Sequence, residues 1–212
     1  MAPRRKPRAM SRRKRAVLIG VALIGTALLI WLDRGAIAPL RSPPPTAGRR
    51  VAEVDRSRYH GRTFPVARVV DGDTLHLAVP DGAEPDTKVR LLGIDAPEMG
   101  GWGDERRYYA EEATDCAEHL AEGRPVTVYL DEQAGSRGKY GRLLAYLELP
   151  DGTILNEQLV LEGCAYADLR FRHSHFHKYK QLEASARALG KGLWPNVTPE
   201  RTPHWRQEML AE

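Results

Sequence analysis

A hairpin pattern between residues 63 and 79 constrains the fold of this chain more than any other feature of its sequence. Residues 63–70 and 73–79 are short and rich in β-branched side chains, and Leu75, Leu77 and Val79 occupy every second position. This spacing is typical of a strand with one buried face, and the Asp71-Gly72 pair between the segments is a two-residue hairpin signal. The pattern therefore predicts two antiparallel strands joined by a tight turn.

Further periodic segments extend this pattern to a whole domain. Apolar residues return at strand spacing in residues 88–94, 126–130 and 143–149. They return at helical spacing in residues 110–120, 155–162 and 179–189, and Gly190 is expected to cap the last of these helices. Three strands, a helix, two strands and further helices predict an α+β domain. We expect a five-stranded closed β-barrel of the OB type with about three helices.

An uncharged apolar run from Ala16 to Leu32 precedes this domain. At ~1.5 Å per residue, a helix over this run just spans a ~30 Å hydrocarbon core. A cleaved signal peptide is the alternative, because Ala36-Ile37-Ala38 has the A-x-A pattern, although Pro39 disfavours cleavage and Trp31 is typical of an interfacial anchor. We therefore predict a transmembrane helix at residues 16–32, or an uncleaved signal, in a single-pass protein of the cell membrane.

The charge distribution sets the orientation and the domain limits. Residues 1–15 carry eight basic and no acidic side chains, which favours a cytoplasmic N-terminus and a domain outside the cytoplasm, periplasmic or extracellular. Without residues 1–38 the chain has 23 basic and 27 acidic residues, so the domain has no general attraction for polyanions. We predict a Pro/Arg-rich linker at residues 33–60, a domain at 61–196 and a C-terminal tail at 197–212.

Four acidic residues stand at the ends of the first predicted strands. Asp71 and Asp73 flank the hairpin turn, and Asp95 and Glu98 follow the third strand in Asp95-Ala96-Pro97-Glu98. Calcium prefers several oxygen ligands, which carboxylates and a backbone carbonyl supply. Because Pro97 fixes the turn, the carbonyl of Ala96 is free to point at a metal ion. The pattern predicts a site for a hard cation.

Two arginines are candidates for phosphate binding. Arg90 lies in the third strand, and Arg142 follows Lys139-Tyr140-Gly141. A guanidinium group binds a phosphate with two parallel hydrogen bonds. Arg90 and Asp95 are five residues apart and would lie on opposite faces of a regular strand, so the site requires a bend at Gly93.

Four motifs in this order resemble those of the staphylococcal nuclease (thermonuclease) family. The resemblance covers about residues 63–194. The motifs are Val70-Asp71-Gly72-Asp73-Thr74, Val89-Arg90-Leu91-Leu92-Gly93-Ile94-Asp95-Ala96-Pro97-Glu98, Lys139-Tyr140-Gly141-Arg142-Leu143-Leu144-Ala145-Tyr146 and Leu155-Asn156-Glu157-Gln158-Leu159-Val160.

The resemblance implies a Ca²⁺-dependent, sugar-nonspecific endonuclease that cleaves DNA and RNA to 3′-phosphorylated products. It places the metal ligands on Asp73, Asp95 and the carbonyl of Ala96, with Asp71 contacting the metal through a water molecule or supporting one of these ligands. The implied catalytic residues are Arg90, Glu98 and Arg142. Glu98 would either orient or deprotonate the attacking water.

Substrate-binding residues are less completely matched. Lys139, Tyr140 and Phe171 are candidates, but of the tyrosines that the type member of the family carries near Leu169-Arg170-Phe171, only the aromatic ring of Phe171 remains. The alternative function is a catalytically inactive OB barrel that binds nucleic acid or protein at the cell envelope. We expect a monomer.

The cysteines and three histidines allow further interpretations. Cys116 and Cys164 are the only cysteines, and outside the cytoplasm they form either a disulfide or two buried thiols. His173, His175 and His177 alternate, which is compatible with zinc binding, but we favour an exposed loop because no fitting fourth ligand is evident.

Overall fold

The computed structural model describes residues 47–98 and 108–211. The chain divides into two compact units, Met1–Pro45 and Thr46–Glu212, and all described residues belong to the second. The predicted cytoplasmic segment and the predicted membrane span at residues 16–32 therefore lie outside the described residues. Within the two described ranges, none of the helices has the length and apolar character needed to cross a membrane.

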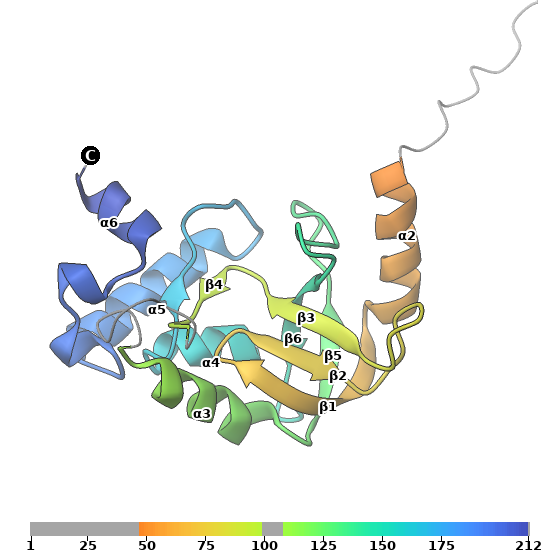
Figure 1. The fold of residues 1–212 in the computed structure, drawn as a ribbon, viewed down its shortest axis with the longest axis horizontal. Helices are drawn as coiled ribbons and strands as arrows, with labels where there is room; N and C mark the ends of the chain where they lie inside the picture. The colour runs from red at the N-terminus through yellow and green to blue at the C-terminus, as the bar shows by residue number, and fades with distance from the viewer. Residues whose placement is uncertain (1–46, 99–107, 212) are drawn as a thin grey trace, which may run out of the picture. The chain divides into compact units, whose positions relative to one another are not determined.

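Five strands form a closed barrel, as the sequence predicts. They are β1 (Arg62–Asp71), β2 (Thr74–Leu77), β3 (Thr87–Leu91), β5 (Pro125–Tyr129) and β6 (Leu143–Glu148). The strand order is β1-β2-β3-β6-β5, and β5 pairs with β1 to close the barrel. Only the β3–β6 pair is parallel among the barrel pairs, and the other four are antiparallel. This is the OB-type α+β arrangement, with the strands at the centre of the fold (Figure 1).

The barrel interior is filled by alternate residues of the strands. Thr87, Val89 and Leu91 of β3 are buried, whereas Lys88, between the first two, is exposed. Val126 and Val128 of β5 alternate in the same way. Burial of each such side chain contributes about 1.5–3 kcal/mol to folding. The period-two pattern that predicts the strands therefore also stabilises the barrel.

All three helices that the sequence predicts for the domain are present. The first is α3 (Ala110–Ala121), which packs against β1 through a face of small residues that includes Ala113 and Ala117. The others are α4 (Leu155–Leu161) and α5 (Phe176–Ala188), which lie side by side (Figure 1). Gly163 and Gly190 follow α4 and α5 with φ of 72° and 60°, the left-handed conformation expected of helix-ending glycines.

The folded part begins before residue 61, because a helix covers nearly half of the predicted linker at residues 33–60. Residues Ala47–Tyr59 form α2, which ends directly before β1. The side chain of Tyr59 is fully buried and its hydroxyl lies 3.2 Å from that of Thr87. Asp55 is also buried and binds Arg137, with an O–N distance of 2.6 Å. These long-range contacts attach a helix whose other residues are mostly exposed.

The C-terminal residues also fold, which corrects the prediction of a simple tail at residues 197–212. After the 3₁₀ turn η2 (Trp194–Asn196), the chain forms η3 (Pro199–Arg201) and then α6 (His204–Ala211). The guanidinium of Arg206 pairs with the buried carboxylate of Glu183 on α5. The described residues thus contain two α-helices, α2 and α6, beyond the three that the sequence predicts.

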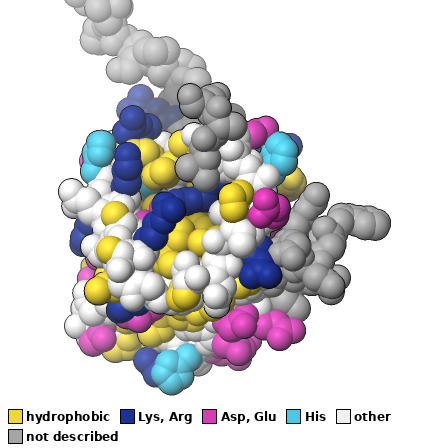
Figure 2. Space-filling model, turned by 90° about the vertical axis from the view of Figure 1, so that its left-hand side faces the viewer, with side chains coloured by type: hydrophobic (Ala, Val, Ile, Leu, Met, Phe, Trp, Pro, Cys, Tyr) yellow, Lys and Arg dark blue, Asp and Glu magenta, His cyan; other side chains and the backbone are white. Residues whose placement is uncertain are grey.

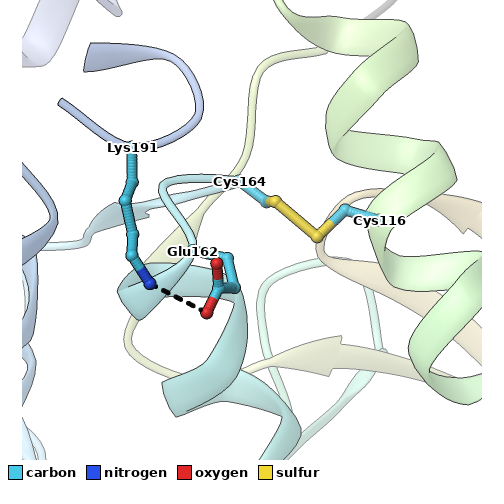
Figure 3. The surroundings of a disulfide bond; sticks show 4 residues. All are labelled: Cys116, Glu162, Cys164 and Lys191. Atoms are coloured by element: carbon cyan, nitrogen blue, oxygen red, sulfur yellow. Dashed lines mark hydrogen bonds and ion pairs between the residues drawn. A yellow bond between two sulfur atoms is a disulfide. The ribbon is translucent and has the colours of Figure 1, made fainter.

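A disulfide joins Cys116 on α3 to Cys164, which follows α4 (Figure 3). The two Cα atoms are 6.5 Å apart, within the range that a disulfide spans. Close by, Lys191 donates to Glu162 over 3.1 Å. The bond connects the helix that packs on the barrel to the segment that leads into the smaller sheet described below.

Candidate active site

The hairpin between β1 and β2 places two carboxylates in different surroundings. Asp71 is half-buried, and its Oδ1 accepts a hydrogen bond of 3.1 Å from the backbone N of Asp73, which fixes the turn. Asp73 is 1% exposed, and its Oδ2 accepts from the backbone N of Ala96 at 2.8 Å. A Cβ atom on Gly72 would lie 2.7 Å from that of Ala96, so the glycine allows this close approach.

A second, two-stranded sheet carries Asp95. Its strands are β4 (Ile94–Asp95) and β7 (Tyr166–Ala167), which pair antiparallel. Between β3 and β4 the chain turns at Gly93, where φ is 80°, and the imidazole of His173 occupies the space that a Cβ atom would need. This is the bend that the sequence required. It brings Arg90 Nη2 within 2.7 Å of Asp95 Oδ1.

The Arg90 guanidinium lies between the two buried carboxylates and pairs with both Asp73 and Asp95. Burial lowers the pKa of Arg90, although the attraction of Asp95 opposes this shift and repulsion from Arg142 adds to it. Arg142 is linked to Asp73 through one intervening side chain. Its Nη1 donates to the Thr74 hydroxyl at 2.9 Å, and that hydroxyl in turn donates to Asp73 Oδ1 at 3.0 Å.

Two further residues bind Asp95 and were not identified from the sequence. Arg170 Nη2 donates to Asp95 Oδ1 at 2.9 Å, and Trp205 Nε1 donates to Asp95 Oδ2 at 2.9 Å. Burial by itself would lower the pKa of Arg170, but its hydrogen bond to Asp168 and the attraction of Asp95 raise it. Asp168 lies two residues before Arg170 and accepts hydrogen bonds from it, so this nearby acidic residue could have indicated that Arg170 is held in place. No comparable signal marks Trp205.

A cavity of about 640 Å³ opens beside the carboxylate of Asp95. Residues 95–98 form one wall, so Glu98, which is exposed, faces the same space as Asp95 and Ala96. Residues between Glu200 and Gln207, together with Tyr166 and Arg170, complete the lining. Figure 2 views the side of the molecule that carries α5 and α6, where basic and hydrophobic side chains lie next to one another.

The predicted substrate-binding residues lie on the surface. Tyr140 and Phe171 are 76% and 65% exposed. The ammonium of Lys139 lies 5.6 Å from the centre of the Tyr140 ring, and the guanidinium of Arg142 lies 5.9 Å from it. Tyr140 is thus next to one of the candidate catalytic arginines, and none of these four residues lines the cavity.

The donor set suits a hard cation. In the described part of the chain, no cluster of three or more His, Cys, Asp or Glu side chains forms a metal site. The predicted ligands instead combine two carboxylates, Asp73 and Asp95, with the backbone carbonyl of Ala96. Asp73 and Asp95 both pair with the Arg90 guanidinium, so the two carboxylates lie close to the same cationic group, and all candidate donors are oxygens. This arrangement fits calcium or magnesium better than zinc.

The fold and the site together define a class of proteins: small OB-type barrels that present paired carboxylates, arginines and an exposed glutamate at one edge. Comparison with known sequences identifies the family. Residues 88–196 match the family described as "Staphylococcal nuclease homologue". The chain belongs to the staphylococcal nuclease family.

Individual relatives agree with this assignment. An "Uncharacterized endonuclease" of Escherichia coli O157:H7 is 33% identical over 147 residues, which cover 69% of this chain and 84% of that protein. The "Thermonuclease" of Staphylococcus hyicus is 31% identical over 141 residues, covering 66% and 80%. "Endonuclease YhcR" of Bacillus subtilis (strain 168) is 32% identical over 143 residues, covering 63% and 11%. These matches support a nuclease, that is, a hydrolase acting on nucleic acids.

Proposed function

We propose that this protein is a calcium-dependent, sugar-nonspecific endonuclease that hydrolyses DNA and RNA to 3′-phosphorylated products. The observation that carries the proposal is the contact of Arg90 with both Asp73 and Asp95, with Arg142 linked to Asp73 through the Thr74 hydroxyl. The acidic pair provides oxygens for a divalent cation, and the two arginines provide donors for a phosphodiester. The names of the relatives support the same reaction.

Hydrolysis of a phosphodiester requires an oriented water molecule, neutralisation of charge at phosphorus and a stabilised leaving oxygen. Glu98 is exposed beside Asp95 and is the residue that would orient or deprotonate the water. Arg90 and Arg142 would hold the phosphate and stabilise the negative charge that grows in the transition state. Arg90 is suited to this because its side chain is only 14% exposed, where electrostatic interactions are stronger.

Asp73, Asp95 and the carbonyl of Ala96 would hold the calcium ion, and Asp71 would support them from the hairpin. When bound, the cation polarises the phosphoryl oxygens of the substrate. Within the protein, Thr74 and the backbone N of Ala96 orient the Asp73 carboxylate.

The surface around Arg142 and Arg170 is the proposed place for the rest of the substrate, because Tyr140 lies beside the first and Phe171 beside the second. Tyr140 and Phe171 offer exposed rings for base stacking, and Lys139 offers a cation for a neighbouring phosphate. Because the domain has more acidic than basic residues, binding of long polyanions should depend on this local cluster and on the metal ion.

We further propose a location at the cell membrane, through a helix at residues 16–32, with the nuclease domain outside the cytoplasm and acting as a monomer. The apolar run and the basic residues before it support this orientation. The disulfide between Cys116 and Cys164 is compatible with it, because disulfides persist in oxidising compartments. Protease accessibility of the domain in intact cells tests the orientation, and protection from protease would contradict it.

The test of the reaction uses the full-length chain with single-stranded DNA and RNA, in calcium or in chelator. We expect cleavage of both polymers in calcium and none in chelator. Glu98→Gln should abolish most of this activity, whereas Glu132→Gln, at an exposed residue that does not line the cavity, is the matched control. Binding of nucleic acid without cleavage under all metal conditions would instead favour an inactive barrel.

A further inference from the structure

The two oxygens of the Asp95 carboxylate have different partners. Oδ1 accepts from Arg90 at 2.7 Å and from Arg170 at 2.9 Å, whereas Oδ2 accepts from the indole N–H of Trp205 at 2.9 Å. An indole N–H is a donor only, so it cannot itself ligate a cation. Trp205 therefore fixes one oxygen of the carboxylate and leaves the other oxygen on the side of the arginines and Asp73.

Helix α6, which carries Trp205, is attached to the same sheet as Asp95. Arg206 pairs with Glu183, and Glu183 Oε2 also accepts from the backbone N of Ala167 at 2.8 Å. Ala167 belongs to β7, which pairs with β4 and hence with Asp95. A single buried carboxylate thus connects α6 to the sheet that positions Asp95.

Aromatic and cationic contacts hold the indole in place. The Arg170 guanidinium lies 4.8 Å from the centre of the Trp205 ring while also binding Asp95. The Arg206 guanidinium lies 5.0 Å from the ring of buried Tyr166 and 5.4 Å from that of Trp194. Arg206 also lies 5.8 Å from the centre of the Trp205 ring, so the indole contacts two guanidinium groups besides its bond to Asp95.

Two of the residues that make these contacts lie outside the part of the chain that matches the family. That match ends at residue 196, whereas Trp205 and Arg206 lie beyond it. The family assignment therefore gives no role to the C-terminal segment.

We propose that Trp205 is a positioning residue for Asp95, and that the C-terminal segment is thereby part of the proposed calcium site. This inference rests on the proposed function, in which Asp95 is a metal ligand. Hydrogen bonds to ligating carboxylates orient them, and loss of such a partner lowers metal affinity by about 10–100-fold. A carboxylate without its Oδ2 partner rotates more freely and must lose that freedom when it binds the metal.

The test compares the full-length chain with its Trp205→Phe variant, which keeps an aromatic ring but loses the N–H donor. Calcium binding is measured by calorimetry, without substrate. We expect the dissociation constant of Trp205→Phe to rise by about 10–100-fold. Met209→Ala, at an exposed position of the same helix, is the matched control and should leave the constant unchanged.

A second readout separates positioning from a loss of structure. If Trp205 acts through Asp95, cleavage by Trp205→Phe recovers when calcium is raised, and KM for DNA at saturating calcium is unchanged. A purely structural role would lower the thermal midpoint and would not be reversed by calcium. Should Trp205→Phe fail to fold, Trp205→His, which keeps a ring N–H, serves instead and should bind calcium with intermediate affinity.

The outcomes distinguish this inference from the proposed function. Equal calcium affinity of the unchanged chain and of Trp205→Phe overturns the role of Trp205 and leaves the nuclease proposal intact. Absence of calcium binding by the unchanged chain overturns both. A weaker affinity that recovers in the cleavage assay at high calcium supports the role of Trp205.

Discussion

Loss of the Cys116–Cys164 bond should lower the stability of the domain by an amount that follows from its position. The two cysteines are 48 residues apart, and the loop between them contains the end of α3, the strands β5 and β6, and α4. The chain-entropy relation for a loop of this length gives about 4 kcal/mol of stabilisation at 25 °C. For a folded unit of this size, about 4 kcal/mol corresponds to a shift of roughly 8–16 °C in the unfolding midpoint.

The perturbation is the double variant Cys116→Ala/Cys164→Ala, compared with the unchanged chain under oxidising conditions. Urea unfolding followed by circular dichroism gives the free energy of unfolding of each. We expect a difference of about 2–5 kcal/mol, the usual range for a native disulfide. Nuclease activity at 25 °C should persist in the variant, because the bond lies outside the group of residues around Asp73 and Asp95.

A second form of the experiment uses the unchanged chain with and without reductant. Thiol titration of the native protein should find no free thiol before reduction and two after it. Equal stability of the double variant and the oxidised chain, or two free thiols in native protein purified without reductant, would refute the reasoning.

Other changes have equally specific outcomes. Arg142→Ala should lower kcat about 10²–10³-fold through lost transition-state stabilisation, with little change in calcium affinity; an unchanged kcat in single-turnover cleavage would exclude Arg142 from the reaction. Asp55→Asn should destabilise the domain by about 1.5–3 kcal/mol in urea unfolding, because Arg137 loses its buried charged partner but keeps Asp81, and a change near zero would mean that α2 is not held by this pair. Burial lowers the pKa of His173, so its contribution to stability is present above the unfolded pKa near ~6.5 and is lost as the pH falls through the lower folded value. His173→Gln should therefore flatten the decline in unfolding free energy below about pH 6.5, and an equal decline in both proteins would assign the effect to other groups.

The sequence predicts the barrel because its signals are local. Alternation of apolar residues, as in Leu75 and Leu77, and the turn at Asp71-Gly72 depend on neighbouring positions only. The bend at Gly93 is predictable for a similar reason, since Arg90 and Asp95 can meet only if the strand is interrupted between them. In the structure the chain turns at Gly93, and Arg90 contacts Asp95 as the predicted site requires.

The missed elements are held by contacts between distant residues. The contact of Trp205 with Asp95 joins positions 110 apart, and that of Asp55 with Arg137 joins positions 82 apart. Neither α2 nor the C-terminal segment carries an apolar stripe that marks it as part of a core. Each is attached through a few buried or half-buried side chains. Their partners lie far away in the sequence, so local patterns do not indicate the contacts.

The histidine-rich segment shows a similar limit. The sequence favours an exposed loop there, but His173 is 4% exposed. Its Nδ1 lies 2.8 Å from the Tyr146 hydroxyl, and its ring packs against Gly93. The expectation of an exposed loop is therefore wrong for His173, because aromatic residues from other elements cover it. The same contact supports the turn that positions Asp95.

The most direct test of the central claim is end-group analysis of a DNA oligonucleotide incubated with the full-length protein in calcium, in chelator and with the Asp95→Asn variant. The account predicts fragments with 3′-phosphate ends in calcium, no cleavage in chelator, and strongly reduced cleavage by Asp95→Asn that additional calcium restores only in part. Cleavage that persists in chelator, or that is unaffected by Asp95→Asn, would contradict a metal-dependent site at Asp73 and Asp95.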